Sequence, residues 1–143
     1  MSAMPPDSVP LGDALRRAAA RLGAAGVNDA QVDAELLAAH VRGTGRGAIQ
    51  AAAVRGDALT AEEAARLEDL VARRATRVPL QHLTGSAPFR HLELRVGPGV
   101  FVPRPETEMV AQLAIDALSA AASPSPIAVD LGTGSGAIAL SMA

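Results

Sequence analysis

The sequence predicts an α/β protein with three parts: a small helical bundle over residues 1–76, a strand-rich linker over 77–104, and the beginning of an open α/β domain over 105–143. Apolar residues at helical spacing, bounded by helix start and stop signals, predict the bundle. Alternating apolar and charged residues among prolines and glycines predict the linker. An apolar run followed by a glycine-rich turn predicts the third part, because a buried strand leads into a helix in this way in open α/β sheets.

Two helices are predicted at the start of the bundle. The first ends near Gly23 and Gly26. The second is expected to begin at Asn28, whose side chain can cap the helix while Gln31 reaches back to it, and to end near Gly43. The apolar face of the first helix is Leu11, Leu15, Ala18 and Leu22, and that of the second is Val32, Leu36, Ala39 and His40.

A third helix of the bundle is predicted from Thr60, where Glu63 completes a capping box. Its apolar side is Leu67, Leu70 and Val71, and Arg73, Arg74 and Arg77 suit the negative end of its dipole. Short loops between such helices favour an antiparallel bundle.

The linker is predicted to contain a strand with one solvent-exposed face, because Leu92, Leu94 and Val96 alternate with charged residues. A helix is then expected over 105–118, with Pro105 in its first position. Its apolar face is Val110, Leu113, Ala114, Ala117 and Leu118.

A strand over 127–131 precedes the turn Gly132-Thr133-Gly134-Ser135-Gly136, and a further helix starts after it. A turn this tight needs backbone angles that glycine tolerates, and the missing side chains let a ligand lie against the main chain. The pattern fits a dinucleotide site, a methyltransferase site and an ordinary glycine turn of an α/β protein. Asp130 favours the second, because a carboxylate there repels a pyrophosphate and attracts the ammonium group of S-adenosylmethionine.

Composition excludes several classes of function. All 13 basic residues are arginines, so a Schiff-base lysine and a P-loop lysine are absent. The net charge of −2 supports no direct nucleic-acid binding. There is no cysteine, and the three histidines lack metal-ligand spacing, so no metal site is expected. No signal peptide or membrane-spanning run is recognised, and we expect a cytoplasmic monomer.

The run Pro103-Arg104-Pro105-Glu106-Thr107-Glu108, some 25 residues before Asp130 and its glycines, resembles the linker signature of release-factor glutamine methyltransferases, the HemK/PrmC family. The stretch 77–85 and the apolar residues 89–96 are similar to that family as well. The resemblance is strong over 77–140 and weaker before it. His82 departs from the pattern, since the family usually has Tyr there.

The resemblance implies a class I, Rossmann-like methyltransferase domain that transfers a methyl group from S-adenosylmethionine to the side-chain amide of Gln in the Gly-Gly-Gln motif of bacterial class I release factors. The helical domain is then expected to dock the release factor. The cofactor would lie on Asp130, Gly132, Thr133, Gly134, Ser135 and Gly136, under a wall of Phe101, Pro103, Arg104 and Thr107.

The family's Asn-Pro-Pro-Tyr motif, which positions the substrate amide, is not among these 143 residues. We therefore expect the chain to end inside the methyltransferase domain, to contain no catalytic residue and to be inactive alone. Two other functions stay open: a release-factor-binding module without enzymatic activity, and a dinucleotide-dependent oxidoreductase.

Overall fold

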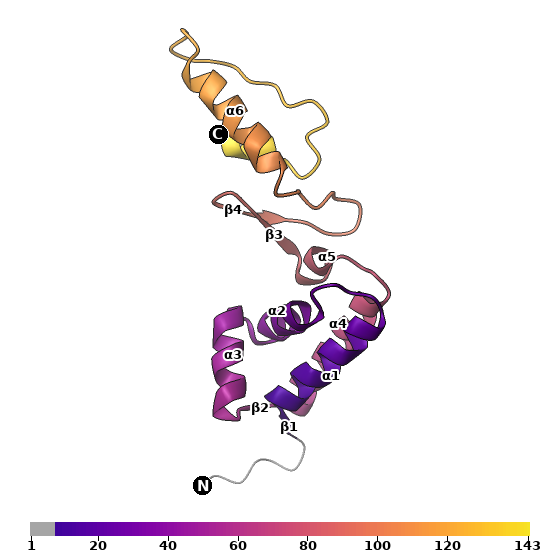
Figure 1. The fold of residues 1–143 in the computed structure, drawn as a ribbon. Helices are drawn as coiled ribbons and strands as arrows, with labels where there is room; N and C mark the ends of the chain where they lie inside the picture. Colours follow the sequence, from indigo (N-terminus) through magenta and orange to yellow (C-terminus); the bar gives the residue numbers. More distant parts are fainter. Residues whose placement is uncertain (1–7) are drawn as a thin grey trace. The chain divides into compact units, whose positions relative to one another are not determined.

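The computed structural model describes residues 8–143, which form two compact units, one ending at Thr84 and one beginning at Gly85. The first unit is helical and the second combines a β-hairpin with two helices (Figure 1). No helix within the described residues is both long enough and apolar enough to cross a membrane.

The helical unit packs α1 against α2, α3 and α4. Two short strands, β1 and β2, pair antiparallel and join the start of α1 to the start of α4, with Val9 opposite Leu59. The elements of the unit are β1 (Val9–Pro10), α1 (Leu11–Ala24), α2 (Ala30–Arg42), α3 (Arg46–Arg55), β2 (Ala58–Leu59), α4 (Ala61–Ala75) and α5 (Leu80–Thr84).

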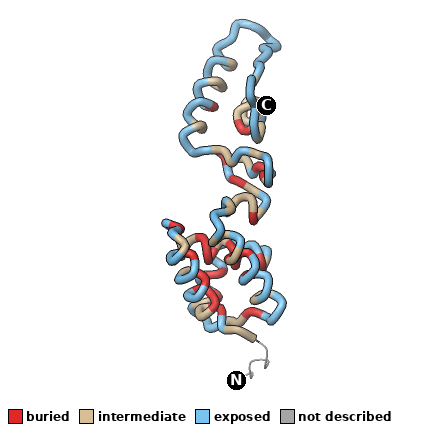
Figure 2. The backbone as a smooth tube through the Cα atoms, turned by 90° about the vertical axis from the view of Figure 1, so that its right-hand side faces the viewer, coloured by how far each residue is buried: buried red, intermediate tan, exposed pale blue. Residues whose placement is uncertain are grey.

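The core of this unit is aliphatic, and its buried residues lie on the inner sides of the helices (Figure 2). The predicted stripe of α1 is confirmed, because Leu11, Leu15, Ala18 and Leu22 are all buried. The capping box of α4 is confirmed too: the Thr60 side chain accepts from the Glu63 amide, and the Glu63 side chain accepts from the Thr60 amide. The largest fully buried side chains of the unit are Leu11, Leu22, Leu37, Ile49, Leu59 and Val71.

The start and the inner face of α2 differ from the prediction. The helix begins at Ala30 after Asp29, and no side chain caps it. Gln31 does not reach back to the cap but donates to Glu35 Oε1 at 2.8 Å. The face is rotated as well: His40 is exposed, and the inner side is formed by Asp33, Ala34, Glu35, Leu37, Ala38, Ala39 and Val41.

Helix α3 was not predicted, and the chain after Gly43 turns directly into it. Gly43 and Gly56 close α2 and α3 in left-handed conformations with φ of 63° and 81°, which glycine adopts without strain. Only Ile49 and Ala52 of α3 are buried. A helix with so narrow an apolar face has a weak periodic signal in the sequence.

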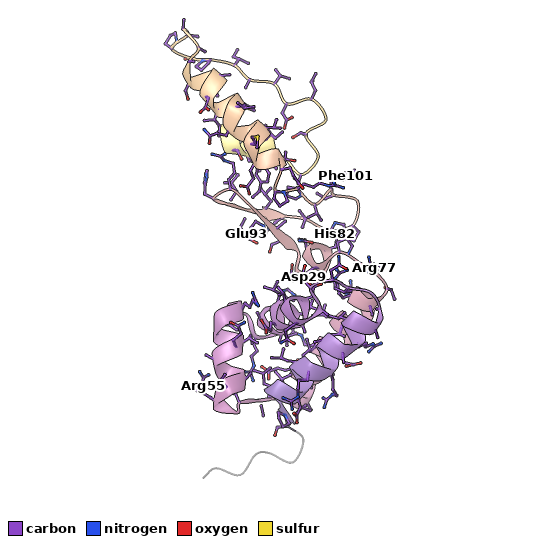
Figure 3. The ribbon with its side chains drawn as sticks, in the orientation of Figure 1. Asp29, Arg55, Arg77, His82, Glu93 and Phe101 are labelled. Carbon is purple, nitrogen blue, oxygen red and sulfur yellow. The ribbon has the colours of Figure 1, made fainter. Side chains whose placement is uncertain are left out.

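The second unit begins with a hairpin of β3 (Ser86–Phe89) and β4 (Leu92–Arg95), in which Phe89 lies opposite Leu92. The predicted alternation is confirmed, because Leu94 and Val96 are buried and Glu93, labelled in Figure 3, is exposed. Two helices follow, α6 (Thr107–Ser119) and α7 (Ala137–Met142), and they pack together. The buried cluster of the unit is Phe89, Leu94, Ala111 and Ala137.

Helix α6 begins two residues later than predicted, at Thr107 and not at Pro105. Its expected apolar face is largely uncovered, since Val110 is 54% and Leu113 is 65% exposed. The buried side chain of the helix is Ala111, which joins the hairpin cluster.

The expected buried strand over 127–131 is not formed among the described residues, so the predicted Rossmann-like start is not confirmed. Ile127, Val129 and Leu131 are 91%, 76% and 88% exposed. A strand of a parallel sheet needs neighbours for its amide and carbonyl groups and cover on both faces. Residues 8–143 supply no neighbouring strand to this segment.

Candidate functional site

The glycine-rich turn has the backbone geometry that its sequence predicts. Gly132, Gly134 and Gly136 all have positive φ, of 73°, 56° and 79°. The Gly136 amide donates to the Thr133 carbonyl at 2.8 Å, which closes the turn just before α7. A Cβ atom built on Gly132 would meet nothing within 4 Å, so the main chain there is open to a ligand. The turn therefore presents bare backbone on a bend that residues other than glycine strain to adopt.

Asp130 lies two residues before this turn and carries a buried polar atom. Its Oδ2 has no hydrogen-bond partner among the described residues. A buried carboxylate oxygen without a donor is costly, and such a group is ordinarily satisfied by a cation or an N–H donor. The Asp130 carboxylate is therefore suited to a cationic group of a ligand.

Asp130 also lines an open cavity of about 760 Å³ beside α6. The lining is mostly apolar: Val110, Ala114, Ala117, Leu118 and Ala121 on the side of α6, Ser123 and 125–130 across from it, and Ile138 and Met142 of α7. Asp130 supplies the cavity's only charged side chain. None of the turn residues 132–136 is part of the lining.

Three of the predicted wall residues lie in the connector between β4 and α6, and Thr107 is the first residue of α6. Phe101, labelled in Figure 3, is 85% exposed, and Arg104 is exposed as well. Pro103 and Thr107 are half-buried, and the Thr107 amide donates to the Arg104 carbonyl at 3.0 Å. The structure does not bring these four residues to the Asp130 cavity.

Arg90 joins the hairpin to α6 through contacts that the sequence did not indicate. It has φ of 54° in the hairpin turn and bonds to the first half of α6. Glu108 Oε1 accepts from the Arg90 amide at 2.8 Å. No pattern in the sequence marks this position, because arginine is not a typical turn residue.

The helical unit contains a buried carboxylate, Glu35, on α2. Gln31, Arg46 and Gln50 donate to it at 2.8, 2.6 and 2.9 Å. Burial alone raises the pKa of Glu35, but the three hydrogen bonds and the charge of Arg46 outweigh it, so the pKa lies below the ordinary value of 4.5. All three donors come from within the unit, so these bonds give Glu35 a structural role.

A second buried pair joins α2 to α4. Arg74 Nε donates to Asp33 Oδ2 at 2.7 Å, and Arg74 Nη1 donates to the Val78 carbonyl at 3.1 Å. The Arg74 side chain is therefore largely buried in an ion pair, whereas Arg73 is exposed.

A shallow cavity of about 510 Å³ opens on the helical unit between α2, α4 and α5. Its floor is apolar, with Leu70 and Leu83, and its rim is polar, with His40, Arg66, Asp69 and Arg73. No group of side chains within residues 8–143 has the composition and spacing of a metal site.

Comparison with known proteins relates both units to one family. The family model described as the PrmC N-terminal domain matches residues 13–85, half of the chain. The release factor glutamine methyltransferase of Streptomyces coelicolor is 53% identical over 127 residues, which are 89% of this chain and 43% of that protein. The proteins of the same name from Bifidobacterium longum and Mycobacterium tuberculosis are 44% and 48% identical, over 91% and 93% of this chain and 45% and 41% of their own length.

The chain thus spans less than half the length of these curated relatives. The match to the Streptomyces coelicolor protein is long enough, at 127 residues, to include residues of both units. The chain belongs to the PrmC family, and the relatives that it resembles are named release factor glutamine methyltransferases.

Proposed function

We propose that the chain supplies the release-factor-docking domain and the first part of the S-adenosylmethionine site of a protein-glutamine methyltransferase. The substrate is the side-chain amide of Gln in the Gly-Gly-Gln motif of a class I release factor. The single observation that supports the cofactor most is the buried, unpartnered Oδ2 of Asp130 directly before the open glycine turn. The proposal also rests on the names of the relatives.

The residues present fit the cofactor in two respects. The Asp130 carboxylate can accept hydrogen bonds from the ammonium of the methionine part, because its buried oxygen lacks a donor. The backbone of Gly132 and Gly134 can approach the ligand, since little crowds the position of a Cβ atom there. S-adenosylmethionine, when bound, supplies an activated methyl group on a sulfonium centre.

The dinucleotide alternative fits these residues less well. The same carboxylate would face a pyrophosphate, and two like charges in a partly buried site repel each other strongly. A chain that binds NAD in preference to S-adenosylhomocysteine would favour the oxidoreductase over the methyltransferase.

An NMR titration of the full 143-residue chain tests the cofactor part of the proposal. We expect S-adenosylhomocysteine to shift the amide signals of Gly132, Gly134 and Gly136, and NAD to leave them unchanged. Because the segment 127–131 is not held in a sheet, the affinity will be low, and per-residue shifts detect weak binding better than heat does. Shifts caused by NAD alone would refute the proposal.

The helical unit is proposed to dock the release factor. It has a complete aliphatic core of its own, and its cavity between α2, α4 and α5 combines an apolar floor with an arginine rim. Binding of a purified release factor to the chain, measured by surface plasmon resonance, should occur without cofactor. Methylation of the release factor by the chain alone is not expected, because the Asn-Pro-Pro-Tyr motif is not among its residues.

A further inference from the structure

Arg90 occupies a turn position where a side chain is unfavourable. Phe89 and Leu92 are paired across the hairpin, so Arg90 and His91 form a two-residue loop. Arg90 has φ of 54° there, and turns with a positive φ at the first loop residue strongly favour glycine, asparagine or aspartate. A strained arginine in such a position points to contacts that its side chain makes elsewhere.

Those contacts are with the first two turns of α6. The Arg90 amide donates to Glu108 Oε1 at 2.8 Å, and Nη1 donates to the Glu108 carbonyl at 3.4 Å. Nη2 donates to Gln112 Oε1 at 2.7 Å, and Gln112 in turn donates to Asp116 Oδ1 at 2.7 Å. One residue of the hairpin thus holds both the main chain and the side chains of α6.

These bonds enclose the connector 96–106, because Arg90 precedes it and Glu108 follows it. Phe101, Pro103 and Arg104 lie in this connector, and Thr107 begins α6 directly after it. Beyond Val96, whose amide donates to the Gly85 carbonyl, the backbone hydrogen bonds of the connector span three residues: Val100 donates to the Gly97 carbonyl, and Thr107 and Glu108 at the start of α6 donate to the Arg104 and Pro105 carbonyls. Arg90, together with the small packing cluster of Phe89 and Ala111, therefore helps to hold the two ends of the connector.

We propose that Arg90 is a positioning residue that holds the connector in place for the cofactor, through Glu108 and Gln112. The cofactor half of this inference rests on the proposed function, whereas the effect on the connector does not. The competing explanation is that Arg90 has a purely structural role in the hairpin. Replacing Arg90 by glycine separates these two explanations.

Arg90→Gly is the informative variant. Glycine relieves the strain of the positive φ and keeps the amide that donates to Glu108, but it removes the guanidinium. The hairpin of the variant should be at least as stable as before, while the guanidinium hydrogen bonds to Gln112 and to the Glu108 carbonyl are lost. His91→Gly is the matched control, because it places glycine in the same loop at an exposed side chain.

Hydrogen exchange of single amides in the full chain measures whether the Arg90 side chain restrains the connector. In Arg90→Gly we expect exchange at Val100, Thr107 and Glu108 to be roughly tenfold faster, the size expected from losing hydrogen bonds of a charged donor. Exchange at Val96, whose amide donates to the Gly85 carbonyl beside the hairpin, should not rise. Equal rates in Arg90→Gly and His91→Gly, or a rise that includes Val96, would overturn the inference.

The cofactor half is read from the titration with S-adenosylhomocysteine. Arg90→Gly should weaken binding about fivefold, and His91→Gly should not change it. Faster exchange in the connector with unchanged affinity would overturn the role of Arg90 toward the cofactor. If the unmodified chain showed no binding, the proposed function would fail while the exchange rates still decided whether Arg90 holds the connector.

Discussion

Replacing Glu35 by Gln tests how the helical unit is held together. Glu35 is 6% exposed and accepts three hydrogen bonds, one of them from the charged Arg46. A glutamine keeps one acceptor oxygen and turns an NH₂ group toward the remaining donors. The charge-assisted bond then weakens by about 1 kcal/mol and one amide bond worth about 1 kcal/mol is lost, a total of about 2 kcal/mol.

The direction of the Glu35 pKa shift predicts how the stability effect of Glu35→Gln changes with pH. The pKa of Glu35 is lower in the folded protein than its ordinary value of 4.5, so the unfolded chain binds more protons between the two values. The contribution of Glu35 is therefore present above pH 4.5 and is lost as the pH falls through the folded pKa. The difference in stability between the original chain and Glu35→Gln should shrink in that direction.

Thermal unfolding followed by far-UV circular dichroism between pH 3 and pH 7 measures both effects. At pH 7 the melting temperature of Glu35→Gln should fall by about 10 °C, which corresponds to ~2 kcal/mol for a domain of this size. Glu68→Gln is the matched control, because Glu68 pairs with Arg21 on the surface and should change stability little. A difference that grows toward low pH, or equal effects of both variants, would refute the reasoning.

Two further predictions concern the ends and faces of the helices. Thr60→Ala should destabilise the chain by about 1 kcal/mol, because it removes the acceptor for the Glu63 amide, and urea unfolding with no loss of stability would show that the capping box is not needed. Leu37→Ala should cost about 3 kcal/mol, since Leu37 is fully buried, and Leu36→Ala should cost clearly less. The reverse order in urea unfolding would mean that α2 presents the face predicted from the sequence and not the one in the structure.

The sequence predicted well where local signals agree with tertiary packing. The stripe of α1 and the capping box of Thr60 need only residues three or four apart, and both were confirmed. The alternation of Leu94 and Val96 with charged residues predicted β4 for the same reason. Each of these signals lies within a single helix or around a single strand.

The prediction failed where distant residues decide. The inner face of α2 carries Asp33 and Glu35, which are buried because Arg74 and Arg46 reach them from other helices. Hydrophobic periodicity assigns such carboxylates to the surface, so the buried face that it predicted for α2 is rotated relative to the observed one. The prediction of a strand over 127–131 failed for a different reason: the apolar run is a strong local signal, but the strand requires neighbouring strands to form.

The candidate site shows both situations. The positive φ values of Gly132, Gly134 and Gly136 followed from the glycine spacing alone. The role of Arg90 could not be foreseen, because its partners lie 18 and 22 residues away on α6. The assignment of Phe101, Pro103, Arg104 and Thr107 to the cofactor wall stays a prediction.

The most direct test compares the binding of S-adenosylhomocysteine to the full chain with Asp130→Asn, with Asp69→Asn of the helical unit as the control. If the Asp130 carboxylate holds the ammonium of the cofactor, its replacement should weaken binding at least about tenfold, as expected for the loss of a charge-assisted hydrogen bond, and Asp69→Asn should bind normally. Unchanged affinity in Asp130→Asn, in a chain that binds the compound, would contradict the central claim.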